Sequence, residues 1–238
     1  MRSLQSLTLV FVSDAPAIRR NFVDLDRYRE LSHLRIEGLV DGFQSVFPGV
    51  AVELKTLEII RSEIDEFSLF GAVHKTITRL VLKDTRWKLY LYSEFSQLKE
   101  LELVDEAGSQ VLHFRASGFP RLTDLSIHAL RPMGSGDSFT DCLRSFIANA
   151  NDEPKSLSLT IGPNANLEYV RALLAQARFK KLESLFFAGS SPRTASFQAF
   201  LDHHRSLKNL TLDISLSEHH GRTTVSWPAG SCMHAFQT

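Results

Sequence analysis

Residues 98–103, Leu-Lys-Glu-Leu-Glu-Leu, carry leucine at the first, fourth and sixth positions of the hexapeptide. In an extended chain, side chains two positions apart point to the same side, so Leu101 and Leu103 share one face and Glu102 points away from it. A single strand of this length cannot bury its apolar face alone. The hexapeptide therefore predicts a strand that needs neighbours of the same kind.

The same L-x-x-L-x-L pattern recurs along almost the whole chain, with successive starts separated by 27, 23, 23, 21, 24, 32, 28 and 25 residues. Its 27 anchor positions hold 21 leucines, four isoleucines, one phenylalanine and one proline. Such regular spacing predicts strands that stack into a parallel sheet, each returned to the same edge by a connection in another layer. The nine copies begin at Leu4, Leu31, Leu54, Ile77, Leu98, Leu122, Pro154, Leu182 and Leu207.

The connections between copies predict short amphipathic helices wherever they are long. Residues 164–179 place Leu167, Val170, Leu173 and Leu174 on one stripe, and similar stripes occupy residues 62–73, 138–148 and 196–201. The longest interval also contains residues 131–137, which we interpret as an ordinary loop because no G-K-[ST] phosphate-binding motif follows the glycines. We expect one array over residues 1–215, followed by an irregular tail or degenerate terminal repeat over 216–238.

Composition excludes several classes of protein. Hydrophobic residues make up 43% and charged residues 23%, as in a folded globular chain, and the 27 basic residues balance the 27 acidic ones. Without a net basic field, nucleic acid is not an expected partner. The apolar runs are too short to cross a bilayer, no secretion signal opens the chain, and two distant cysteines make no disulfide framework. We therefore expect a cytoplasmic or nuclear protein without a membrane partner or a cofactor.

The repeated pattern resembles that of the leucine-rich repeat family, over about residues 4–215. The resemblance implies an α/β solenoid, or horseshoe, of about nine repeats with a parallel sheet on its concave side and short helices on its convex side. The ninth position of each copy, usually Asn or Cys in regular members, departs from that pattern, so the array is most similar to the irregular intracellular repeats attached to F-box motifs. Here the ninth position holds Val12, Leu39, Ser62, Thr85, Glu106, Leu130, Gly162, Ser190 and Ser215.

This resemblance implies a protein–protein interaction scaffold rather than an enzyme. In F-box proteins the repeats select the protein to be ubiquitinated, while the F-box binds a Skp-type adaptor. The sequence shows no F-box, so the adaptor is an expected partner only if that motif lies outside this chain. The first anchor lies at residue 4, without a capping segment before it, so we also expect that the native chain continues upstream or that a partner covers the first strand.

Two alternatives stay open. One is a leucine-rich repeat scaffold of immune-like or structural type without ubiquitin chemistry, which the sequence does not separate from the ligase interpretation. The less favoured one is a β-helix enzyme acting on carbohydrate, which the helical stripe at residues 164–179 fits poorly. No G-x-S-x-G nucleophile motif occurs, and the adjacent histidines His203 and His204 lack the spacing of a zinc site, so we expect neither a catalytic nor a metal site.

The third, fifth and seventh positions of each copy point away from the core and form the predicted binding face. Neighbouring strands lie about 4.8 Å apart, which places Arg35 beside Glu58 and Arg79 beside Glu100. Acidic residues gather in the fifth and sixth copies and hydroxyls in the last three, so we expect a basic or hydroxyl-bearing peptide as ligand. The candidate protein-binding residues are His33, Arg35, Glu58, Arg79, Lys83, Glu100, Glu102, Asp124, His128 and Phe186.

Overall fold

The computed structural model describes residues 4–11, 25–39, 53–64, 73–87, 95–105, 119–129, 154–161, 181–189, 204, 206–215 and 222–226. Each of the nine sequence copies contributes one strand, and every strand begins at the third position of its copy. These strands are β1 (Ser6–Val10), β2 (His33–Glu37), β3 (Thr56–Ile60), β5 (Arg79–Lys83), β7 (Glu100–Asp105), β8 (Asp124–Ala129), β9 (Ser156–Ile161), β10 (Ser184–Gly189) and β11 (Asn209–Ser215).

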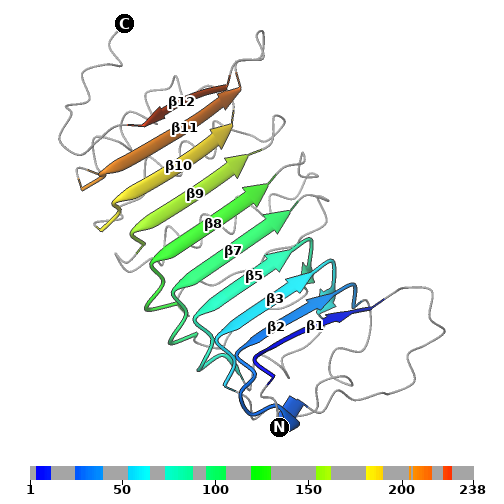
Figure 1. Cartoon of the computed structure of the whole chain (residues 1–238). Helices are drawn as coiled ribbons and strands as arrows, with labels where there is room; N and C mark the ends of the chain where they lie inside the picture. Colours follow the sequence, from blue (N-terminus) through cyan, green and yellow to red (C-terminus); the bar gives the residue numbers. More distant parts are fainter. Residues whose placement is uncertain are drawn as a thin grey trace, which may run out of the picture.

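The nine strands lie side by side in chain order and are all parallel, which makes the fold a repeat solenoid (Figure 1). Their register aligns equivalent positions, so that Leu57, for example, pairs with Leu34 on one side and with Leu80 on the other. The predicted parallel stack is therefore confirmed. A tenth strand, β12 (Arg222–Ser226), pairs antiparallel with β11 and forms the far edge of the sheet.

The fourth and sixth positions of the copies form the core. Leu34, Ile36, Leu57 and Ile59 are fully buried, and their equivalents from Leu80 to Leu210 are at most 5% exposed. A buried aliphatic side chain contributes roughly 1.5–3 kcal/mol relative to an exposed one, so this double row dominates the stability of the array. At β1, the edge strand, the two rows are more open, because Leu7 and Leu9 are only half-buried.

A backbone ladder joins consecutive copies just before the strands begin. In copies two to nine, the N–H groups of the second and third positions both donate to the second-position carbonyl of the preceding copy, as Thr123 and Asp124 do to Lys99, each at 2.9 Å. The hydroxyl of Thr78 donates to one of these carbonyls, that of Lys55, at 3.1 Å. This shared acceptor holds the register through the backbone alone.

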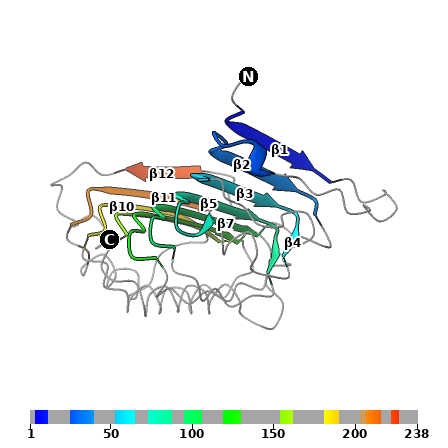
Figure 2. The same ribbon diagram turned by 90° about the horizontal axis from the view of Figure 1, so that it is seen from below.

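Helices on the other side of the sheet were expected, and the segments that predict them, 138–148, 164–179, 196–201 and most of 62–73, lie outside the described residues, as does the loop 131–137. The described connections contain a 3-10 helix, η1 (Leu25–Arg27), and a second parallel pair, β4 (Glu63–Ile64) with β6 (Arg86–Trp87). Figure 2 shows β4 outside the layer of the long strands. Within the described ranges, no helix is long and apolar enough to cross a membrane.

Candidate protein-binding face

All ten residues predicted to bind a partner lie on one face of the sheet. We call it the charged face, and it consists of the residues at the third, fifth and seventh positions of the nine copies. Strand alternation places them there, because these positions point away from the buried fourth and sixth. The parallel register then aligns them into rows. They come from β2 (His33, Arg35), β3 (Glu58), β5 (Arg79, Lys83), β7 (Glu100, Glu102), β8 (Asp124, His128) and β10 (Phe186).

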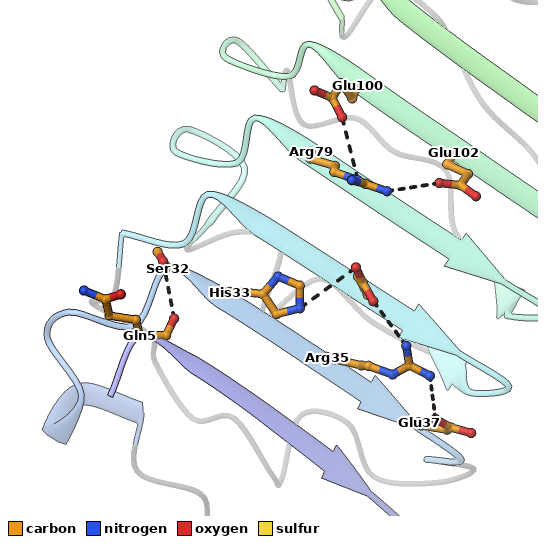
Figure 3. A network of polar contacts seen from close by, with 9 residues as sticks. Gln5, Ser32, His33, Arg35, Glu37, Arg79, Glu100 and Glu102 are labelled. Atoms are coloured by element: carbon orange, nitrogen blue, oxygen red, sulfur yellow. Dashed lines mark hydrogen bonds and ion pairs between the residues drawn. The ribbon is translucent and has the colours of Figure 1, made fainter. Parts of the chain in front are cut away.

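The charges of β2 and β3 form one connected network. Arg35 lies 3.5 Å from Glu58 and 3.0 Å from Glu37, and His33 lies 3.9 Å from the same Glu58 carboxylate (Figure 3). Arg61, which follows β3, pairs with the second oxygen of Glu37. The hydrogen bonds from Arg61 and then Arg35 hold the pKa of Glu37 below its usual range. Each carboxylate of this network therefore already has a cationic partner.

A second network lies on β5 and β7, where one cation serves two anions. Nε of Arg79 lies 3.7 Å from Glu100, and Nη2 lies 3.3 Å from Glu102 (Figure 3). The predicted pairs Arg35–Glu58 and Arg79–Glu100 are thus confirmed, and each arginine also contacts a further carboxylate. The next acidic residue, Asp124 on β8, accepts a hydrogen bond of 2.6 Å from the hydroxyl of Thr123.

The charged face is hollowed beside this second network. An open hollow of about 270 Å³, which we call the serine hollow, spans β5 to β9. On one side lie Arg79 and the two glutamates, and on the other lie hydroxyls. Its polar lining residues are Arg79, Glu100, Glu102, Asp124, Ser126, Ser156 and Ser158.

A serine and a histidine pair at the rim of the serine hollow. Oγ of Ser126 lies 2.7 Å from Nε2 of His128, two residues along β8. Burial lowers the pKa of His128, and the negative charge of Glu102 opposes that shift only in part, so the imidazole is neutral at neutral pH. A neutral imidazole makes this hydrogen bond in either tautomer.

This pair has the contact of a nucleophile and its base, but its surroundings do not favour catalysis. The hollow beside Ser126 holds the carboxylates of Glu102 and Asp124. An oxyanion formed at the serine would be repelled there, whereas acyl transfer needs donors that stabilise it. The pair is therefore a polar contact of the charged face.

No protein-family model and no curated protein sequence matches this chain. The charged face must accordingly be interpreted from its own chemistry. Among the described residues no group of three or more histidine, cysteine, aspartate or glutamate side chains is arranged to hold a metal ion.

The remaining predicted residues lie away from the centre of the serine hollow. Phe186 is half-buried on β10, where its register partner is Ser158. Lys83 is half-buried at the seventh position of the fourth copy, where it is the last residue of β5 and lies between Ile60 and Val104. These two aliphatic residues are each only 8% exposed, as is Val81, so the charged face contains an apolar patch beneath its long polar side chains.

Four features of this face were not predicted as part of the binding site. They are Glu37, Arg61, the contact between Arg79 and Glu102, and the three serines of the hollow. A signal for the serines exists in the sequence, because Ser126, Ser156 and Ser158 occupy neighbouring positions next to long side chains. Short residues beside long ones leave a depression. The Glu37–Arg61 pair has no such signal, because Arg61 occupies a left-handed turn with φ 46° that only the backbone reveals.

Proposed function

We propose that this chain is a non-enzymatic protein–protein interaction scaffold of the leucine-rich repeat type, and that its charged face binds a partner protein. The observation that carries the proposal is the alignment of in-register charged and hydroxyl side chains around the serine hollow on one face of a long rigid sheet. Scaffolds built from stacked repeats offer extended surfaces of this kind to macromolecules. Aligned rows on rigid strands also bind without first paying the entropy of ordering a loop.

We propose further that the repeats are of the irregular intracellular type found with F-box motifs. The support lies at the ninth position, where hydroxyls take the place of asparagine. Oγ of Ser62 accepts a hydrogen bond of 3.1 Å from the backbone N–H of Leu39. The hydroxyl oxygen of Thr85 lies 3.0 and 3.1 Å from the carbonyl oxygens of Ile59 and Lys83, and its one proton can be donated to either of them. In this interpretation the repeats recognise the substrate of a ubiquitin ligase in the cytoplasm or nucleus.

Site-directed photo-crosslinking in cells tests the scaffold function. A benzophenone side chain replaces Ser158 in the serine hollow, and in a matched variant it replaces Lys208, an exposed residue that pairs with Glu183 before β11 begins. We expect a covalent adduct with another protein from position 158 and a much weaker one from position 208. Equal adducts from both positions, or none from position 158, contradict binding at the charged face.

The ligase role has a separate test. The product of the complete reading frame is purified from its native source, and co-purification of a Skp-type adaptor is measured. Stoichiometric recovery of the adaptor supports the ligase interpretation. Recovery of a crosslinked partner without any adaptor favours a leucine-rich repeat scaffold without ubiquitin chemistry.

A further inference from the structure

We infer that the serine hollow binds a single lysine or arginine side chain of an unmodified basic segment of the partner protein. This inference rests on the proposed function and names the chemistry of the ligand. It follows from three properties of the hollow: its charge, its size and the hydrogen-bonding groups that remain available in it.

The charge of the hollow differs from that of the rest of the charged face. In the network of β2 and β3, two arginines, Arg35 and Arg61, pair with two glutamates, Glu37 and Glu58, so the positive and negative charges are equal in number. In the hollow, a single guanidinium faces three carboxylates: those of Glu100, Glu102 and Asp124. A cation that enters the hollow therefore meets an uncompensated negative potential, which steers association and selects the sign of the ligand's charge.

The carboxylates keep acceptor capacity for this cation. Arg79 contacts Oε2 of each glutamate, and Thr123 donates to Oδ2 of Asp124, so the other oxygen of each carboxylate points to no cation among the described residues. A carboxylate accepts up to about four hydrogen bonds. Glu100 is more open than Glu102, with 54% against 36% of the side chain exposed, and is a natural first contact for an arriving ammonium or guanidinium.

The size of the hollow suits a single side chain of the partner. Pockets for whole small-molecule ligands start at about 300 Å³, and the serine hollow, at about 270 Å³ and open to solvent, lies below that range. One long side chain fills such a space while its backbone stays on the surface. The hydroxyls of Ser156 and Ser158 on β9, which bond no other group of the described residues, then lie beside the ligand backbone and can donate to its carbonyls or accept from its N–H groups.

Phosphorylation of the partner segment would oppose this binding. A phosphate adds nearly two negative charges, and beside three carboxylates it meets like-charge repulsion. The hollow therefore discriminates between an unmodified basic segment and the same segment phosphorylated next to its lysine or arginine.

Selection from a random dodecapeptide library displayed on phage tests the inference with the full chain as immobilised target. We expect enrichment of lysine and arginine at one position of the selected peptides over the unselected library. In Asp124→Asn, and in the double variant Glu100→Gln/Glu102→Gln, the enriched synthetic peptide should bind roughly tenfold more weakly, because charge-assisted hydrogen bonds are replaced by neutral ones. Glu183→Gln, which removes an exposed carboxylate away from the charged face, should leave the affinity within about twofold.

The outcomes separate the inference from the proposed function. Peptides that lose binding when Ser158→Trp fills the hollow, but that show no basic enrichment and no effect of Asp124→Asn, overturn the inference and leave the scaffold function standing. Peptides that ignore every substitution on the charged face overturn both. Equal affinity for a peptide with phosphoserine next to its basic residue also overturns the inference, and circular dichroism of each variant verifies that it folds.

Discussion

Oγ of Ser62 lies 3.1 Å from the backbone nitrogen of Leu39, 23 residues earlier in the chain, and the serine donates in turn to the carbonyl of Ile60 at 2.8 Å. Water does not reach the contact between Ser62 and Leu39, because these residues are only 3% and 2% exposed. One buried hydroxyl thus supplies an acceptor to one copy and a donor to its own. A buried N–H without a partner costs free energy, so this contact ties neighbouring copies together.

Ser62→Ala should lower the free energy of unfolding by about 1–3 kcal/mol, because the N–H of Leu39 then stays buried without an acceptor. Ser62→Thr keeps the hydroxyl and should lose far less, since threonine occupies the equivalent position at residue 85. The measurement is the urea midpoint and slope followed by circular dichroism. A loss in Ser62→Ala no greater than that in Ser158→Ala, a serine whose hydroxyl bonds no described residue, would contradict the structural role of this hydrogen bond.

Gly38 marks a point where two copies approach too closely for a side chain. Its φ is +76°, and a Cβ at this position would lie 2.5 Å from the carbonyl oxygen of Phe11. That oxygen belongs to backbone and cannot rotate away. Gly38→Ala therefore combines a left-handed conformation with a steric clash, and we expect it to cost more than the roughly 1–2 kcal/mol of the conformation alone.

The same urea measurement checks this prediction, with Asp84→Ala as the control. Arg61 and Asp84 occupy the equivalent positions of the next two copies and already adopt φ of 46° and 47° with a side chain present. Asp84→Ala should therefore be much less harmful than Gly38→Ala. If Gly38→Ala and Asp84→Ala lowered the free energy of unfolding by similar amounts, the clash with the Phe11 carbonyl would not be the cause of the loss in Gly38→Ala.

The solenoid was predictable because its determinant is local and repeated. Each strand begins at the third position of a copy. The buried residues are those at the leucine positions of the L-x-x-L-x-L pattern, such as Leu101 and Leu103. The pairs Arg35–Glu58 and Arg79–Glu100 followed from register alone. Alternation and register are backbone properties, and sequence spacing reports them directly.

The Arg79–Glu102 contact, the β4–β6 pair and the serine hollow could not be predicted from the spacing of residues in the sequence. The contact between Arg79 and Glu102 is diagonal across two strands and depends on the rotamer of a long side chain. The pair β4–β6 arises after the strands end, where the sequence has no periodic pattern. The serine hollow lies where short side chains adjoin long ones on four neighbouring strands. The L-x-x-L-x-L pattern does not specify the size of the side chains at these positions.

Acid should weaken the β2–β3 network through Glu37. Its pKa is lowered by Arg61 and Arg35, so the folded state binds the proton less tightly than the unfolded chain does. The stabilisation is complete above the pKa of an unfolded glutamate, about 4.3, and is lost as the pH falls through the lower pKa of the folded state. We expect the urea midpoint of the wild type to fall in this range more steeply than that of Glu37→Gln, which has no proton to take up.

Glu53→Gln is the matched control for this experiment, because Glu53 is exposed and lies outside the strands. Its acid profile should follow that of the wild type. If Glu37→Gln and the wild type lost stability in parallel below about pH 4.3, the arginine contacts would not be the source of the acid sensitivity.

Neutral His128 should make the charged face sensitive to mild acid. Burial lowers its pKa below the unfolded value of about 6.5, and the charge of Glu102 raises it in part. The neutral form is therefore favoured on folding, and stability falls as the pH drops from about 6.5 through the lower pKa of the folded state. Protonation also places a positive charge at the rim of the serine hollow, so a basic peptide bound there should bind more weakly at the acid end of the same range.

The imidazole resonances of His128, followed by NMR across this pH range, measure the shift directly. Glu102→Gln removes the opposing charge and should lower the pKa of His128 further, whereas Glu100→Gln, on the same strand and not a contributor to that pKa, should change it less. A rise in the pKa of His128 in Glu102→Gln would reverse the sign of this electrostatic coupling. Glu102 would then not be the charge that opposes the effect of burial on the pKa of His128.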